Sequence, residues 1–242
     1  MSHKKVVLSL LCAVALSTTL QADKTEDDAL ATHSELGYIQ TDGNTKTKTF
    51  NLDSTLKKGW GKNIFKLKLD AQYASDNDTE TKNKYLIELN YNYEFSKRFA
   101  FDYLIGYKSD KFSSFDYQFY TGPGAQYKAI DAAKHTLALS GNILYAKDDF
   151  KDSDKSNSYA AYQAKGIYGW KITQSLKFDQ ELSFRGSFEE SSNYFIFSKS
   201  AIISKISDIF SAGLSYKVDY VNEPGDKEKT DTTLTANLII DY

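Results

Sequence analysis

The chain has a single cysteine and only two prolines among its 242 residues, and no long apolar run follows residue 22. Cys12 lies in an apolar stretch near the start, so the remainder of the chain has neither a disulfide framework nor a thiolate metal site. A transmembrane helix needs about 20 predominantly apolar residues, and no later segment approaches that length. A disulfide-stapled domain and a bundle of membrane helices are therefore both excluded.

The first 22 residues differ from the rest of the chain. Lys4 and Lys5 form a short basic segment, an almost unbroken apolar run follows over residues 6–16, and an acidic stretch begins at Asp23. This order is typical of a secretory signal peptide, and the apolar run is too short to cross a bilayer as a helix. We predict cleavage after Ala22, and an N-terminal membrane anchor is the alternative.

Removal of residues 1–22 would leave 28 Lys and Arg against 32 Asp and Glu, a net charge of −4. A net negative charge does not indicate a nucleic-acid-binding protein, because such proteins carry clustered positive charge. With 26 % charged residues the chain is too polar for a helical membrane protein, but it suits a barrel in which every second residue meets lipid. We expect a signal peptide over 1–22, a short periplasmic segment over 23–33 and an outer-membrane barrel domain over 34–242.

Strict alternation of apolar and polar side chains dominates the sequence from residue 62 onward. It is clearest in residues 65–73, 85–95 and 210–220. A period of two indicates β-strands with one apolar face. The predicted fold is an all-β, antiparallel, up-and-down transmembrane barrel of about 12 strands, with 10 as the alternative. The expected strands are 34–42, 46–58, 63–74, 83–95, 98–108, 115–128, 135–146, 158–170, 175–186, 193–204, 209–220 and 231–242.

The expected connections alternate in length. One set is short (59–62, 96–97, 129–134, 171–174 and 205–208), and the other is mostly longer and acidic (75–82, 109–114, 147–157, 187–192 and 221–230). Short periplasmic turns and longer external loops are typical of outer-membrane barrels. Aromatic residues recur near both ends of the expected strands, which predicts two girdles at the membrane interfaces.

Gly122, Pro123 and Gly124 interrupt a strand that should be fully paired. Proline lacks the N–H that a β-ladder requires. We interpret this segment as a bulge or kink, and a functional constriction is the alternative, because bulges occur near functional sites.

The faces opposite the apolar ones should line the lumen. A barrel of about 12 strands stands between small barrels filled by side chains and 16-stranded porins. The sequence therefore favours a narrow or occluded channel for small ions or solutes. A non-conducting structural or osmotic- and salt-stress envelope protein is the alternative. The lumen-lining candidates are Lys66, Lys68, Asp70, Glu88, Glu94, Asp102, Lys108, Lys177, Asp179, Glu181, Arg185, Lys217 and Asp219.

An enzyme is a weaker interpretation. A hydrolytic nucleophile needs a nearby base. His3 would leave with the signal peptide, His33 precedes the first expected strand, and His135 begins a strand at a periplasmic turn. We predict no catalytic residue and no cofactor.

Acidic residues gather in one expected outer loop, at Asp148, Asp149, Asp152 and Asp154. Their oxygens suit a hard divalent cation, but their spacing differs from that of an EF-hand loop. We predict no metal site and interpret the stretch as a solvated loop that touches cation-bridged lipopolysaccharide.

The final strand ends on alternating apolar residues, among them Leu238, Ile240 and the terminal Tyr242. This pattern resembles the C-terminal signal by which outer-membrane barrels are delivered to the barrel assembly machinery. The expected partners are that machinery, periplasmic chaperones, outer-membrane lipid and lipopolysaccharide. The oligomeric state stays open.

Several short motifs occur in order along nearly the whole mature chain. They are Leu36-Gly37-Tyr38 followed by Gly43-Asn44-Thr45, the segment 120–127 with its two glycines, Tyr216 and Tyr220, Pro224, Asp231-Thr232 and the final alternating strand. In their order and spacing they resemble the family called domain of unknown function 481 (DUF481), some members of which are described as salt-induced outer-membrane proteins. The resemblance implies a location and a fold, and it brings no catalytic residues.

Overall fold

The computed structural model describes residues 30–42, 46–151 and 156–242. The predicted signal peptide and most of the predicted periplasmic segment lie outside these ranges. The described residues contain no helix long and apolar enough to span a bilayer.

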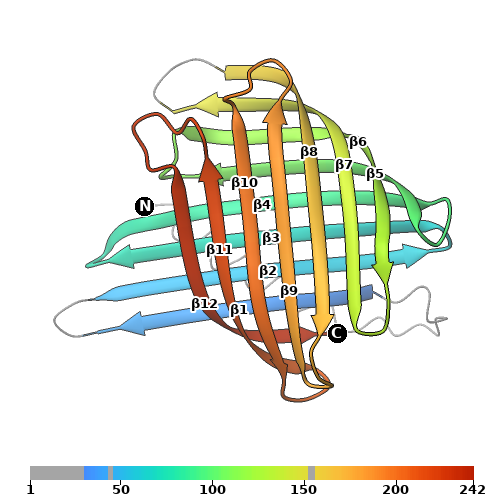
Figure 1. Cartoon of the computed structure of the whole chain (residues 1–242). Helices are drawn as coiled ribbons and strands as arrows, with labels where there is room; N and C mark the ends of the chain where they lie inside the picture. Colours follow the sequence, from blue (N-terminus) through green and yellow to red (C-terminus); the bar gives the residue numbers. More distant parts are fainter. Residues whose placement is uncertain (1–29, 43–45, 152–155) are drawn as a thin grey trace.

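Twelve strands account for nearly all of the described residues, and they form one closed antiparallel barrel in which each strand pairs with its sequence neighbours (Figure 1). The first and last strands pair with each other and close the ring. The strands are β1 (Leu30–Thr41), β2 (Thr47–Trp60), β3 (Asn63–Asp76), β4 (Thr79–Glu94), β5 (Phe99–Asp110), β6 (Phe115–Asp131), β7 (His135–Phe150), β8 (Ser156–Lys171), β9 (Leu176–Ser187), β10 (Tyr194–Lys205), β11 (Phe210–Val221) and β12 (Thr230–Asp241).

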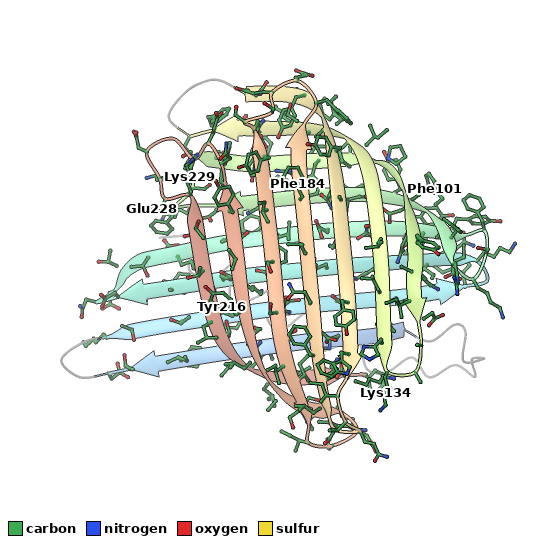
Figure 2. All side chains as sticks on the ribbon, viewed as in Figure 1. Phe101, Lys134, Phe184, Tyr216, Glu228 and Lys229 are labelled. Carbon is green, nitrogen blue, oxygen red and sulfur yellow. The ribbon has the colours of Figure 1, made fainter. Side chains whose placement is uncertain are left out.

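The two ends of the barrel differ in their connections. We call one the turn end, where 61–62, 95–98, 132–134, 172–175 and 206–209 link the strands, and the other the loop end. Figure 2 places Lys134 at the turn end and Glu228 and Lys229 at the loop end. Figure 1 also shows β1–β4 on the far wall crossing β8–β12 on the near wall at a steep angle, as the strand tilt of a closed barrel requires.

The predicted number and order of strands are confirmed, but β3, β4, β5, β7 and β8 extend further toward the loop end than expected. The expected loop 75–82 is wrong: β3 and β4 continue to a turn at Asn77 and Asp78, whose φ angles are +46° and +60°. Two successive positive φ angles form the tight hairpin turn that matches strand twist, and Asn and Asp tolerate it. The difference in length between the two sets of connections is smaller as a result. The longest described connection is 222–229.

The predicted bulge at Gly122, Pro123 and Gly124 is also wrong. The register with β5 continues through all three residues. Toward β7 it resumes at Gly124 with the same offset after two unpaired positions. Proline removes a donor there without inserting a residue. A Cβ at Gly122 would lie 2.0 Å from the carbonyl oxygen of Ile143, so only glycine allows this approach of β6 to β7.

The outward faces of the strands are strongly apolar. Ile143, Leu182 and Leu214 are each more than half exposed. Aromatic rings stack between neighbouring strands near both ends, as two girdles require. The stacks are Trp60–Phe65–Tyr91, Phe99–Tyr127 and His135–Trp170 near the turn end, and Tyr85–Tyr107–Tyr117 and Phe184–Tyr194–Tyr220 near the loop end.

The seam between β1 and β12 is short. Four residue pairs join the two strands, from His33–Asp241 to Leu36–Leu238, whereas β1 and β2 pair over twelve residues. Thr32 and Tyr242 extend the seam at the turn end by exchanging two backbone hydrogen bonds. Beyond Leu36, toward the loop end, neither strand has a ladder partner at this junction.

Candidate functional site: the barrel lumen

The inward faces of the strands carry a dense set of charged groups. All thirteen lumen-lining candidates lie at inward strand positions, because they alternate with the outward apolar residues. The six that are buried are Lys68, Asp70, Glu88, Asp102, Arg185 and Lys217. Four others, Lys66, Glu94, Lys177 and Asp179, lie nearer the turn end of their strands and are partly exposed.

Two ion pairs join opposite walls of the barrel. Lys68 Nζ on β3 lies 2.9 Å from Glu181 Oε2 on β9, and Lys108 Nζ on β5 lies 3.1 Å from Asp219 Oδ1 on β11. The strands of each pair stand six places apart in the ring of twelve. Side chains from opposite walls therefore meet at this level of the lumen.

Further pairs extend this layer. Lys199 Nζ contacts Glu35 Oε1 at 2.6 Å and Asp53 Oδ2 at 2.8 Å, and Lys217 forms an ion pair with Asp70. Five different strands contribute these five residues. We call these residues, together with Lys68, Glu181, Lys108 and Asp219, the charge layer.

Three more residues complete the contacts of the charge layer. Lys165 Nζ lies 2.8 Å from Glu181 Oε1 and 3.5 Å from Glu88 Oε2, and Lys84 Nζ lies 2.5 Å from Asp219 Oδ2. We count Lys165, Glu88 and Lys84 as part of the layer. A buried ion pair is weak evidence for stability, but removal of one partner leaves an uncompensated charge and costs about 3–5 kcal/mol.

Two buried carboxylates use neutral donors instead. Asp102 accepts hydrogen bonds from the amide groups of Asn90, Asn92 and Asn142, the shortest at 2.6 Å from Asn142 Nδ2. Asp148, only 1 % exposed, accepts from Gln118 Nε2 at 2.9 Å and from Tyr159 Oη at 2.7 Å. Hydrogen bonds to the charged form hold a carboxylate in a buried site without a cation.

An apolar cluster faces inward beside the charged groups, which the sequence analysis did not anticipate. Its buried members are Leu104, Tyr120, Leu144, Ala146, Tyr159 and Ala161. Tyr120 also donates a hydrogen bond of 2.6 Å to Glu88 Oε1. Apolar side chains therefore fill part of the lumen at this level.

Arg185 is 7 % exposed and lies between two aromatic rings. Its guanidinium carbon is 4.4 Å from the centre of the Tyr120 ring and 4.5 Å from that of Phe195. No ion pair of Arg185 occurs within the described ranges, and its Nη1 is buried without a hydrogen-bond partner. The side chain borders a cavity of about 80 Å³.

A second cavity, of about 260 Å³, opens above the charge layer toward the loop end, and we call it the vestibule. Lys84, Lys108 and Asp219 line both cavities. Two connections meet over this end, because the hydroxyl of Ser114 donates a hydrogen bond to the carbonyl of Pro224. Ser114 lies in the connection between β5 and β6, and Pro224 lies in the connection between β11 and β12. These two strand pairs stand on opposite sides of the ring, so the connection 222–229 reaches across the mouth of the barrel.

The structure corrects the place of one histidine. His33 lies within β1, which begins at Leu30 rather than residue 34, and its Nδ1 is 2.6 Å from Asp241 Oδ1. The strand begins early because pairing with β2 starts at Leu30. His135 begins β7 at the turn end and stacks on Trp170.

No group of three or more His, Cys, Asp or Glu side chains within 30–42, 46–151 and 156–242 is arranged to hold a metal ion. Asp148 and Asp149 belong to β7 rather than to a loop. Asp152 and Asp154 lie outside the described residues.

Five members of the charge layer were not among the residues selected from the sequence: Glu35, Asp53, Lys84, Lys165 and Lys199. Lys84 and Lys165 occupy inward positions that strict alternation could have identified. Lys199 could not be identified from the sequence, because its inward neighbours Phe197 and Ala201 are apolar. Apolar and polar residues therefore do not alternate along β10.

Comparisons with known proteins agree with the fold. An outer membrane channel from Pseudomonas putida F1 superposes with a TM-score of 0.53 at 10 % identity, covering 92 % of this chain and all of that one. The NanC porin gives a TM-score of 0.47 at 11 % identity, covering 88 % of this chain and 98 % of that one. At these identities the likeness concerns the fold alone.

Sequence comparison gives the family. The uncharacterized protein YdiY of Escherichia coli (strain K12) is 25 % identical over 207 residues, which are 84 % of this chain and 79 % of that protein. The model of the family described as protein of unknown function, DUF481, matches residues 34–242. The chain belongs to the DUF481 family.

Proposed function

We propose that this protein resides in the outer membrane and forms a narrow passage for small ions that the charge layer closes at rest. The outer-membrane location is supported by the apolar outward faces. Side chains such as Ile143 (66 % exposed) and Leu214 (51 % exposed) would face water on a soluble barrel, but they suit contact with lipid.

The closed state rests on one observation: the ion pairs Lys68–Glu181 and Lys108–Asp219 join opposite walls. An open 12-stranded lumen would keep such groups apart and hydrated. The paired arrangement predicts a conductance far below that of a porin. The contact between Ser114 and Pro224 narrows the same path a second time at the loop end.

Conductance of the purified protein in planar bilayers tests this proposal. Wild type is expected to show rare, small current steps. The double variant Lys68→Gln with Glu181→Gln keeps side-chain size but removes the pair, so it should open more often and conduct more. The control is Lys205→Gln with Asp208→Asn, an exposed pair 2.7 Å apart at the turn end of β10, which should behave as wild type.

A stable, porin-sized current from wild type would overturn the closed passage. The absence of current from wild type and from the Lys68/Glu181 variant alike would favour the non-conducting envelope protein instead.

A further inference from the structure

We propose that Arg185 forms the anchor of a binding site for a small carboxylate anion inside the lumen. The inference deepens the proposed function, since the site lies on the path that the proposed passage uses. It concerns binding, which is measured independently of conduction.

The first argument is an unmatched donor. Arg185 is only 7 % exposed, and its Nη1 has no hydrogen-bond partner in the part of the chain that the structure describes. Guanidinium remains charged in proteins, so it cannot escape the cost of burial by losing its proton. A buried donor without a partner is destabilising, and a bound acceptor would satisfy it.

The second argument is that the surrounding carboxylates are already engaged. Glu181 is held by Lys68 and Lys165, and Asp219 by Lys84 and Lys108. Of the other two carboxylates that line the cavity, Glu88 pairs with Lys165, and Asp70 pairs with Lys217 through Oδ2, while its Oδ1 has no partner among the described residues. Asp148, which does not line it, accepts from Gln118 and Tyr159 instead. The cavity lining holds five cations and four carboxylates, which leaves one positive charge in excess and suits a monoanion.

The third argument is geometric. The guanidinium carbon lies over the rings of Tyr120 and Phe195, which restrict its movement, and Nη1 is left for a ligand. A planar carboxylate accepts two parallel hydrogen bonds from a guanidinium fork. The cavity measures about 80 Å³, whereas one water needs about 10–15 Å³ on the same measure. A small anion therefore fits, and it would reach the cavity from the vestibule.

Acetate is the probe. Binding of ¹³C-labelled acetate to the full-length barrel in detergent micelles, at constant ionic strength, is followed by NMR line broadening. Wild type should bind acetate, and Arg185→Gln should bind it at least about tenfold more weakly, the factor that corresponds to roughly 1.4 kcal/mol. The matched control is Arg98→Gln, because Arg98 lies exposed in the connection 95–98.

Two further variants keep the test decisive if Arg185→Gln folds poorly. Gln163 lies directly opposite Arg185 in the register of β8 and β9. Gln163→Glu should place a carboxylate beside the guanidinium, abolish acetate binding and raise the melting temperature. Arg185→Lys keeps the charge without the fork and should bind acetate more weakly than wild type.

Three results would overturn the inference: no acetate binding by folded wild type, equal binding by wild type and Arg185→Lys, or equal competition by chloride at the same concentration. Acetate binding without bilayer current would leave the site intact and contradict only the proposed passage. Current without acetate binding would contradict the binding site and leave the proposed passage intact.

Discussion

Lys68 and Glu181 meet at 2.9 Å although β3 and β9 stand at opposite points of the ring. Both side chains lie away from water, at 7 % and 17 % exposure. The pair therefore joins two walls that share no backbone hydrogen bond.

Reversing one charge of this pair should destabilise the barrel. Glu181→Lys would bring a third ammonium group to Lys68 and Lys165, with an expected loss of about 3–5 kcal/mol in the free energy of unfolding. Adding Lys68→Glu should recover a large part of that loss. The unfolding midpoint of each variant in micelles, read from heat-modifiable gel migration, measures both effects.

Glu190→Lys is the control for that reversal, because Glu190 lies exposed in the connection between β9 and β10. Its midpoint should match that of wild type. A single Glu181→Lys variant as stable as wild type would show that the pair does not hold the walls together.

The turn at Asn77 and Asp78 gives a second prediction. Asp78 has a φ of +60°, and a β-branched residue there is strongly disfavoured. Asp78→Val should lower the free energy of unfolding by about 1–2 kcal/mol, whereas Asp78→Gly should leave it unchanged or raise it. Denaturant titration in micelles compares the two, and equal effects of Val and Gly would contradict the turn geometry.

Tyr242 should matter for assembly more than any single loop residue. Its backbone exchanges two hydrogen bonds with Thr32 at the end of the short seam. Deletion of Tyr242, or Tyr242→Asp, should reduce the amount of heat-modifiable protein in the envelope. Tyr194→Asp, at the loop end, serves as an aromatic control with a smaller expected loss. Normal levels of the truncated protein would contradict a role in closure.

Export gives a fourth prediction. The mature chain should begin near Asp23 and fractionate with the outer membrane, because residues 1–22 have the order of a signal peptide. Mass spectrometry of the native N-terminus is the measurement. An intact Met1 would favour a membrane anchor, and recovery in the soluble periplasm would favour a soluble, lipocalin-like barrel.

The sequence was sufficient to predict the strands and their faces because one rule governs most of them. Alternation alone assigns Lys68 to the lumen and Leu67 to the outer face, without any knowledge of the neighbouring strands. The length of β4 was underestimated because Thr79 and Glu80 look like loop residues, yet they extend the ladder past the expected boundary.

The contacts across the lumen could not be predicted in the same way. Whether Lys68 meets Glu181 depends on strand tilt and on the register summed over the strands between them, which no local pattern records. The contacts of Arg185 with Tyr120 and Phe195 could not be predicted for a simpler reason. Inward positions were expected to be polar, and aromatic residues were assigned to the interfaces.

The short seam between β1 and β12 makes one line of the barrel wall different from the rest. The sheet is a ribbon curled into a ring and joined at one corner, where His33–Leu36 meet Leu238–Asp241. Above that corner the two edges form no ladder pairs with each other, and a hydrocarbon environment could not replace those hydrogen bonds. Thermal fluctuation of the wall should therefore concentrate along this line rather than around the whole circumference.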